Sequence, residues 1–274
     1  MLLSGIFVLS VALAVLLYLS CGWWWVLILG FIGGFLLLAG LVFLFFWGTC
    51  QLIDTTKPQQ KDSMFYRYMT YLCVDAALQA LRVKICCSGM EKVPKNGRFL
   101  LVCNHTSNLD PAFLLSAFKK NQLAFISKRE NKDMFIVGKL MHKLMCQLVN
   151  RENDREALKT ILKCIQLIKD DEVSIAVFPE GYIHEDRKLH TFRHGVFKIA
   201  QKAKVPVVVC TMKDTHYIMD KVSQLKSARV ELNVLSVISA EEVAEVSTVD
   251  LGNRIYEMMA ADLGPERVAQ EENT

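Results

Sequence analysis

The residues from Met1 to Ile53 form a long apolar stretch without a single Asp, Glu, Lys, Arg or His. Because the hydrocarbon core of a bilayer needs about 20 apolar residues per helical span, this stretch is long enough for two crossings. The small residues from Ser20 to Gly22 interrupt it. We therefore predict a membrane helical hairpin within residues 1–50, with helices at roughly Leu2–Leu19 and Val26–Trp47.

Aromatic and charged residues around the hairpin support this interpretation. Trp23-Trp24-Trp25 follow the break and Trp47 ends the second helix, and such amphipathic rings are enriched at membrane–water interfaces. Lys57 and Lys61 come next, so the positive-inside rule predicts that the rest of the chain faces the cytoplasm. Two alternatives stay open. One is a cleaved signal peptide, which normally needs a basic residue before its apolar core, and the other is a hairpin that dips into one leaflet only.

Residues 51–81 are expected to hold a polar linker, which includes Pro58, and then an amphipathic helix from Ser63 to Leu81. The apolar residues of this segment recur at helical spacing. The helix could lie on the membrane surface or pack on the domain that follows. The sequence favours neither arrangement.

From Arg82 onward, short apolar runs alternate with amphipathic stretches, which is typical of an α/β domain with a largely buried sheet. We place this domain at residues 82–264 and predict that the polar residues 265–274 form a flexible tail. The predicted strands are Val83–Cys87, Phe99–Cys103, Ala124–Ser127, Val173–Phe178, Val205–Cys210 and Arg229–Ile238. The predicted helices are Pro111–Phe118, Met134–Gln147, Arg155–Lys169, Val196–Lys202 and Leu251–Leu263.

Composition adds a membrane context and removes some functions. The mean hydropathy of +0.26 and the apolar fraction of 52% are high for a soluble domain, which agrees with a membrane segment plus one globular domain. The net charge of +4 indicates no nucleic-acid partner but suits anionic lipid surfaces. The nine cysteines include no CxxC pair and predict reduced thiols in the cytoplasm.

The segment Asn104-His105-Thr106-Ser107-Asn108-Leu109-Asp110 follows a predicted strand. Asp110 before Pro111 is a good helix start, so one interpretation makes Asp110 a helix cap and His105 a loop residue. In the other interpretation Asp110 holds one ring N–H of His105 and leaves the other nitrogen free to take a proton. A base acting directly on a substrate hydroxyl is then the simplest chemistry, because the only nearby cysteine, Cys103, is more typical of a core position.

A second segment, Phe178-Pro179-Glu180-Gly181, also follows a predicted strand. Pro179 ends the strand, Glu180 offers a carboxylate, and Gly181 lets the backbone approach a ligand closely. Farther along, His184, Glu185, His190 and His194 lie close together in the sequence. They could belong to a metal-dependent hydrolase, but Gly195 and an ill-defined helix start make a rigid pair of histidines doubtful, and we assign no metal ligands.

Taken together, these segments resemble the glycerolipid acyltransferases typified by lysophosphatidate (1-acylglycerol-3-phosphate) acyltransferase. Four blocks occur in the order of that family, and the resemblance spans about residues 83–238. The blocks are His105-x4-Asp110, Lys128-Arg129-Glu130 with the apolar run that ends at Arg151, Phe178–Gly181, and Val205–Val209, with Phe192–Ala200 similar to a further family stretch between the last two.

The resemblance implies an α/β fold with a mixed sheet and transfer of a fatty acyl group to the free hydroxyl of a lysophospholipid. The acyl donor would be a co-substrate, acyl-CoA or acyl-carrier protein, with no further cofactor, and the bilayer would hold the acceptor. His105 would act as the base and Asp110 would orient it. The substrate-binding residues implied by the family blocks are Arg151, Glu180, Gly181, Lys128 and Arg193.

Some positions depart from the family pattern. Tyr182-Ile183 follows Gly181 where Thr-Arg is common, which leaves the acceptor head group open. Met145 stands in place of a usual glycine, and Cys210 in place of a common proline. None of these positions belongs to the His–Asp pair. The alternatives to an acyltransferase are a membrane-associated lipid hydrolase that uses a metal or Cys103, and a non-catalytic membrane adaptor.

Overall fold

The computed structural model describes residues 2–150 and 153–269. Its α/β domain is built on a seven-stranded sheet with the order β1-β7-β6-β2-β5-β3-β4. The β6–β7 pair is antiparallel and the other pairs of this sheet are parallel, so the prediction of a mixed sheet is confirmed. The strands are β1 (Val83–Ser88), β2 (Leu100–Cys103), β3 (Leu123–Lys128), β4 (Gln147–Val149), β5 (Ser174–Val177), β6 (Val207–Lys213) and β7 (Ala228–Ile238).

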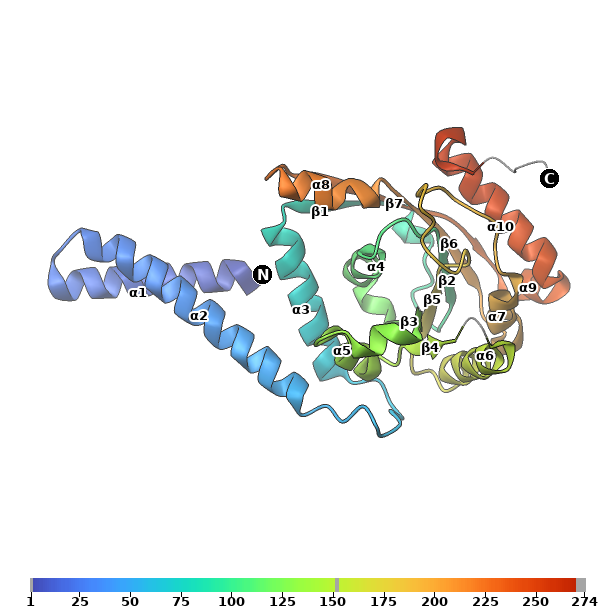
Figure 1. The fold of residues 1–274 in the computed structure, drawn as a ribbon, viewed down its shortest axis with the longest axis horizontal. Coiled ribbons are helices and arrows are strands. Elements are labelled where there is room, and N and C mark those ends of the chain that lie inside the picture. Colours follow the sequence, from blue (N-terminus) through green and yellow to red (C-terminus); the bar gives the residue numbers. More distant parts are fainter. Residues whose placement is uncertain (1, 151–152, 270–274) are drawn as a thin grey trace.

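Helices cover both faces of the sheet (Figure 1). Because side chains alternate along a strand, Leu100 and Val102 of β2 join the core cluster on one face while Leu101 and Cys103 join the cluster on the other. Helices α6 (Asp154–Lys169), α7 (Lys198–Ala203), α9 (Ala240–Glu245) and α10 (Thr248–Leu263) pack on the first cluster. Helices α3 (Met64–Ala80), α4 (Asp110–Ala117) and α8 (Ile218–Ser223) pack on the second.

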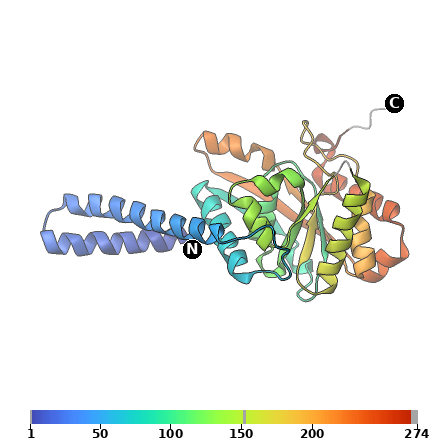
Figure 2. The same ribbon diagram turned by 60° about the horizontal axis from the view of Figure 1, so that its bottom comes forward.

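The apolar N-terminal residues form two antiparallel helices, α1 (Leu2–Cys21) and α2 (Trp25–Gln51), that project away from the domain (Figures 1 and 2). Both are long and apolar enough to cross a membrane. The chain reverses at Gly22, whose φ of 73° suits a residue without a Cβ. The predicted hairpin and its break are therefore confirmed as helical elements.

Helix α3 joins the hairpin to the domain, and it packs on the domain. Its Arg67 side chain is fully buried and forms an ion pair with Asp62 at 2.6 Å. The same guanidinium donates to the carbonyl oxygens of Leu123 (2.8 Å) and Leu144 (3.3 Å), which fixes α3 against β3 and the segment before β4. The ion pair and these hydrogen bonds together compensate the buried charge, as burial requires.

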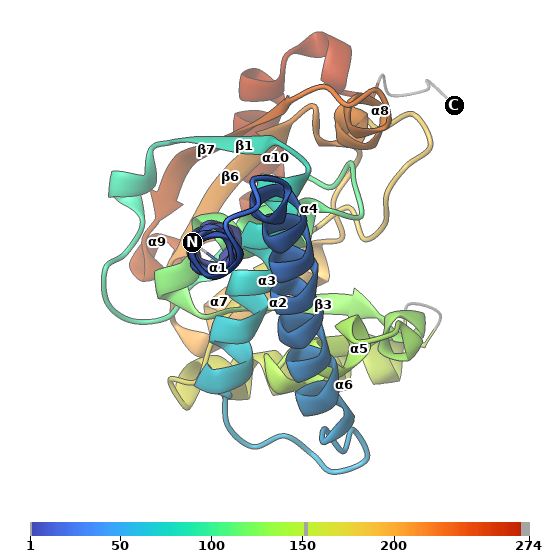
Figure 3. The ribbon, with the colours of Figure 1, turned by 90° about the vertical axis from the view of Figure 1, so that its left-hand side faces the viewer.

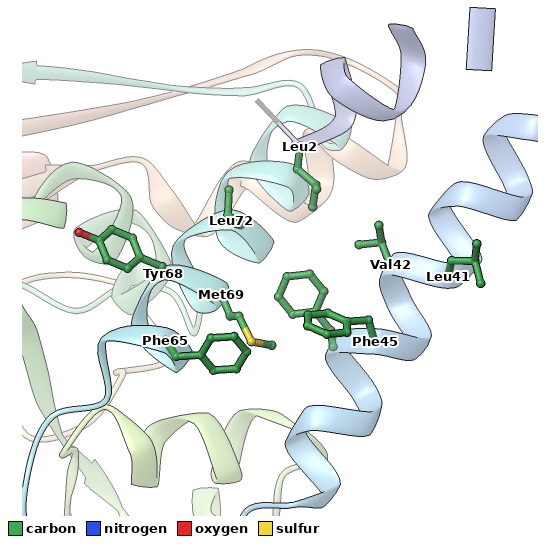
Figure 4. Close-up of a pocket in the computed structure, with 9 residues that line it drawn as sticks. Leu2, Leu41, Val42, Phe45, Phe65, Tyr68, Met69 and Leu72 are labelled. Atoms are coloured by element: carbon green, nitrogen blue, oxygen red, sulfur yellow. The ribbon is translucent and has the colours of Figure 1, made fainter. Parts of the chain in front are cut away.

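The opposite side of α3 faces the hairpin (Figure 3). An apolar groove of about 550 Å³ lies between them, open to the surroundings (Figure 4). Residues of α2 such as Phe45 form one wall, and Phe65, Tyr68 and Leu72 of α3 form the other. Helix α3 thus has one face on the domain and a second, apolar face toward the hairpin.

The helix predicted over Met134–Gln147 is present but too long by several residues at each end. The structure has a 3-10 turn at Arg129–Asp133, then α5 at Val137–Lys143, and then the unpredicted edge strand β4. Positive φ angles at Ile136 (51°) and Met145 (64°) end the helix on both sides. A helical periodicity of apolar residues across both turns concealed these breaks.

Three other segments differ from the prediction. The short helices α8 and α9 were not predicted, although Ser239 and Glu242 form a capping box at the start of α9. The tail expected from Pro265 begins with attached residues: Val268 pairs with Leu189, and Arg267 forms an ion pair with Asp214 at 3.1 Å.

Candidate active site

His105 and Asp110 lie together where β2 ends and α4 begins. The Nδ1–H of His105 donates to Oδ2 of Asp110 at 2.9 Å, and the same oxygen accepts the backbone N–H groups of Thr106 (2.8 Å) and Ser107 (2.9 Å). The Asp110 side chain is fully buried. With Nδ1 occupied by this bond, a neutral ring carries its lone pair on Nε2, which is the nitrogen able to accept a proton.

The capping interpretation of Asp110 is wrong in its detail. Helix α4 begins at Asp110 itself, with Pro111 in the second position. The carboxylate turns back to bind N–H groups of the preceding loop. Asp110 therefore folds the loop around the histidine, and this folding brings the two side chains together.

The loop is also held from the neighbouring strand β6. The buried Asn104 side chain donates to the carbonyl oxygen of Met212 (2.9 Å) and accepts its N–H (2.8 Å). The hydroxyl groups of Thr106 and Thr215 are 2.7 Å apart. This fixes the backbone on both sides of His105.

Phe178, at the end of β5, stacks on the imidazole of His105. The ring centroids are 4.0 Å apart and the planes differ by 14°. The His105 side chain keeps 16% of its surface exposed, so one edge of the ring remains accessible. The stacked Phe178 limits rotation of the ring, and together with Asp110 it sets the direction in which Nε2 points.

Glu180 has an unexpected position for a substrate ligand. It is only 2% exposed, and its carboxylate accepts the backbone N–H groups of His105 (2.8 Å) and His190 (3.1 Å). Burial raises the pKa of this carboxyl to about 8, although the two N–H groups act in the opposite direction. Glu180 therefore ties the His105 loop to the loop that follows Gly181.

A cavity of about 400 Å³ has Phe178, which stacks on His105, and Pro179 in its wall. Its walls are mainly apolar and come from β3, β4, α6 and the segment after β5. Charged groups, Arg193, Lys198 and Asp154, stand around it. The apolar wall residues include Ile126, Val149, Leu158, Ile161, Val177 and Val196.

Two of the predicted binding residues meet at this cavity. Gly181 has a φ of 89°, and a Cβ built on it would lie 2.9 Å from Nε of Arg193, so a larger residue would displace that guanidinium. The backbone N–H of Arg193 donates to the carbonyl oxygen of Pro179 at 2.8 Å, which fixes the distance between the two segments. Arg193 is exposed and lines the cavity with Gly181.

The other two residues predicted to bind substrate are Lys128 and Arg151. Lys128 is the exposed last residue of β3 and pairs with Val149, one of the cavity residues. Arg151 lies outside the described residues, two positions beyond Val149.

The alternative sites considered from the sequence are not assembled. Cys103 is fully buried, and burial raises the pKa of its thiol well above the usual value, which disfavours the thiolate that a nucleophile needs. His184 stacks on His190 at 3.5 Å, while His194 lies against Gly252. Within residues 2–150 and 153–269, no group of three or more His, Cys, Asp or Glu side chains is placed to hold a metal ion.

The part of the chain that holds this site is similar to known proteins. A family model described as Acyltransferase matches residues 84–213, which include both the His–Asp pair and Glu180. Over these residues the chain is similar to the acyltransferase family.

Two named proteins are similar to this chain. It is 34% identical to a probable 1-acyl-sn-glycerol-3-phosphate acyltransferase of Mycoplasma pneumoniae, over 59% of this chain and 61% of that protein. It is 31% identical to a 1-acyl-sn-glycerol-3-phosphate acyltransferase of Chlamydomonas reinhardtii, over 68% and 54%. The matched part thus spans little more than half to three fifths of these two relatives.

A solved structure has the same fold as the α/β domain. The 1-acyl-sn-glycerophosphate acyltransferase PlsC from Thermotoga maritima superimposes with a TM-score of 0.55, at 23% identity, over 70% of this chain and 78% of that one. This likeness confirms the predicted α/β architecture.

Two residues of the candidate site, Asn104 and Phe178, were not predicted from the sequence. Asn104 adjoins His105, and a buried amide that binds a neighbouring strand could have been suspected there. The stack of Phe178 on His105 depends on β5 being next to β2. Strand order gives no local signal in the sequence, so the contact between Phe178 and His105 could not be predicted from it.

Proposed function

We propose that this protein is an acyltransferase that moves a fatty acyl group from an acyl thioester to the free hydroxyl of 1-acyl-glycerol-3-phosphate or a related lysophospholipid. The observation that carries the proposal is the hydrogen bond from His105 Nδ1–H to the buried Asp110, which leaves Nε2 of this partly exposed side chain to accept a proton. The names of the M. pneumoniae and C. reinhardtii relatives support the choice of acceptor.

In this mechanism Nε2 of His105 takes the proton of the acceptor hydroxyl as its oxygen attacks the thioester carbonyl carbon. The carbon–sulfur bond then breaks, and the thiolate of acyl-CoA or acyl-carrier protein leaves with the proton from the imidazolium. Asp110 stabilises the imidazolium between these steps, because its carboxylate is buried against the ring. The products are the diacyl phospholipid and the free thiol.

The cavity beside Phe178 suits the two ends of such a substrate. Its apolar wall can hold an acyl chain, and the exposed Arg193 with Lys198 can bind a phosphate. Lys128 and Arg151 are proposed as further cations for the same phosphate. Glu180 is proposed to position His105 rather than to contact the acceptor, because its carboxylate is used by two backbone N–H groups.

The hairpin is proposed to anchor the enzyme in the bilayer that holds its acceptor, with the acyltransferase domain on the cytoplasmic side. Helix α1 has 20 residues, so it is about 30 Å long, close to the thickness of the hydrocarbon core. Lys57 and Lys61 follow α2 on the side of the domain.

The test is replacement of the base in the full-length protein. His105→Ala is expected to lower kcat by about 10³-fold or more, since it removes the only proposed proton acceptor. Labelled acyl-CoA and acyl-carrier protein should be tested against lysophosphatidate, glycerol 3-phosphate and other lysophospholipids. A melting temperature equal to that of the native protein is the control for folding, and substantial remaining turnover would exclude His105 as the base.

A further inference from the structure

An exposed apolar turn precedes α5. Met134 is 50% exposed, Phe135 71% and Val137 45%, so Phe135 is as exposed as Trp24 at the tip of the hairpin (70%). We call residues 134–137 the apolar turn. Such a cluster on a domain surface is typical of a binding surface rather than of the core.

The backbone imposes this exposure. Ile136 has a φ of 51° and a ψ of −51°, a strained conformation for a β-branched residue, and the N–H of Val137 donates to the carbonyl oxygen of Phe135 across it. The N–H of Gly138 donates to Met134 at 2.9 Å, and a Cβ on Gly138 would lie 2.0 Å from the carbonyl oxygen of Lys132. The turn is therefore a closed, preformed structure, and strain of this kind persists only where the surroundings fix it.

The apolar turn lies beside the end of the hairpin. Lys139, in the first turn of α5, donates from Nζ to Oε1 of Gln51, the last residue of α2, at 2.8 Å. Lys143 donates to Gln59 of the linker at 3.0 Å. Figures 1 and 3 both show α5 next to the lower end of α3, near the point where α2 ends. Any bilayer that holds the hairpin therefore comes close to the apolar turn.

The charges around the turn suit an anionic lipid surface. Lys132 precedes it, and Lys139 and Lys143 follow it on α5. The bonds of Lys139 and Lys143 described above go to neutral amide oxygens, so these contacts leave the positive charges uncompensated. Glu130 and Asp133 on the preceding 3-10 turn oppose them only in part. Apolar side chains flanked by lysines are typical of segments that lie in the interface of a membrane.

We propose that the apolar turn inserts into the headgroup and upper acyl region of the same bilayer that holds the hairpin, with Phe135 as its deepest side chain. The domain is then attached at two places, which holds it in one orientation above the membrane. This inference rests on the proposed membrane anchorage of the hairpin but not on the acyl-transfer chemistry.

The direct test is photo-crosslinking in the full-length protein in nanodiscs of phosphatidylcholine and phosphatidylglycerol. The photoreactive p-benzoylphenylalanine replaces Phe135, and in separate samples Leu37 of α2 or Val249 of α10. Leu37 and Val249 are exposed to 59% and 48%, and α10 lies on the far side of the domain from the hairpin. We expect lipid adducts at positions 135 and 37 and background at 249.

Each other outcome counts against the proposal. Adducts at 37 but not at 135 would overturn the second attachment, and crosslinks from 135 to a second copy of the chain would assign the turn to a protein interface. Background at both 37 and 135 would overturn the anchorage of the hairpin and this inference with it. None of these readouts depends on enzymatic activity.

A kinetic experiment separates this attachment from the active site. Phe135→Asp is expected to raise the KM for lysophosphatidate embedded in vesicles by about fivefold, while turnover of a short-chain acceptor dispersed in water stays unchanged. Val249→Asp, with the same new charge on an exposed apolar position, is the matched control and should change neither value. An equal loss on both acceptors would mean that the substitution acts on the site itself and would overturn the proposal.

Discussion

Two histidine–aspartate pairs in this chain have the same N···O distance but different surroundings. Nδ1 of His105 lies 2.9 Å from Asp110, and Nε2 of His190 lies 2.9 Å from Asp186. The Asp110 carboxylate is fully buried and also accepts two backbone N–H groups, whereas the Asp186 side chain is 43% exposed. A short bond alone therefore does not identify a base and its partner.

The surroundings also decide where each ring can point. His105 is stacked on Phe178 and its backbone N–H donates to Glu180. These contacts fix the orientation of the ring and so the direction in which Nε2 points. His190 stacks on His184, whose ring also lies against Tyr182, on a loop at the surface. Of the two pairs, only the first combines a buried carboxylate with a ring that stacks on a residue of the cavity wall, Phe178. The comparison supports the proposal that His105 takes the proton, and four substitutions test this proposal and the roles of the groups around it.

The largest effect is expected from Asp110→Asn. The amide oxygen can still accept the three N–H groups, but the negative charge that stabilises the imidazolium is lost, and an amide NH2 is buried beside the ring. We expect kcat to fall by about 10²- to 10³-fold, with a smaller change in KM. Steady-state kinetics with a fixed acyl donor measure both constants. A kcat within threefold of the native value would show that the charge is not needed.

Glu180→Gln tests whether ionisation of the buried Glu180 carboxyl, which lies between the two loops, lowers the stability of the folded protein. Because the pKa of Glu180 is raised to about 8 from 4.5, the folded state binds more protons than the unfolded state between these values. The native protein should therefore lose stability as pH rises from about 5 to 8, by on the order of 2 kcal/mol from this group.

The glutamine variant lacks this titration, so its unfolding free energy should vary less over the same pH range. Denaturant unfolding at pH 5, 6.5 and 8 compares the two proteins. Parallel curves for both would contradict the proposed protonation of Glu180. The variant should also turn over more slowly, since an amide NH2 faces one of the two backbone N–H groups that Glu180 now accepts.

Arg193→Gln tests whether the loop that follows Gly181 helps to bind the acceptor phosphate, although its histidines are not proposed to take the proton. The KM for lysophosphatidate should rise about tenfold while kcat changes little, because an exposed cation beside the cavity binds the phosphate without entering the chemistry. Lys202→Gln, which removes an exposed charge from α7, is the matched control. An acceptor without phosphate should show no difference between the native protein and the Arg193 variant.

Much of this comparison could be predicted from the sequence, and the rest depends on tertiary contacts. The apolar hairpin, the buried central strands and the pairing of His105 with Asp110 follow from hydrophobic patterns and motif spacing. The inward orientation of Glu180 could not be predicted, because a carboxylate that binds a ligand and one that binds two backbone N–H groups have the same local sequence. The helix predicted over Met134–Gln147 is too long because Ile136 and Met145 adopt positive φ, which no residue type at those positions indicates.

The smallest effect is expected from Asp186→Asn, which makes in the surface pair the same change that Asp110→Asn makes in the buried pair. His190 should lose its ionic partner, yet its backbone N–H still donates to Glu180, so the position of the loop is retained. We expect kcat and KM to stay within twofold of the native values, because a partly exposed pair contributes little in water. A fall of tenfold or more in kcat would reverse the assignment, since the surface pair would then affect the reaction as the buried one is proposed to do. Measured beside Asp110→Asn in one assay, this variant separates the role of burial from that of the bond itself.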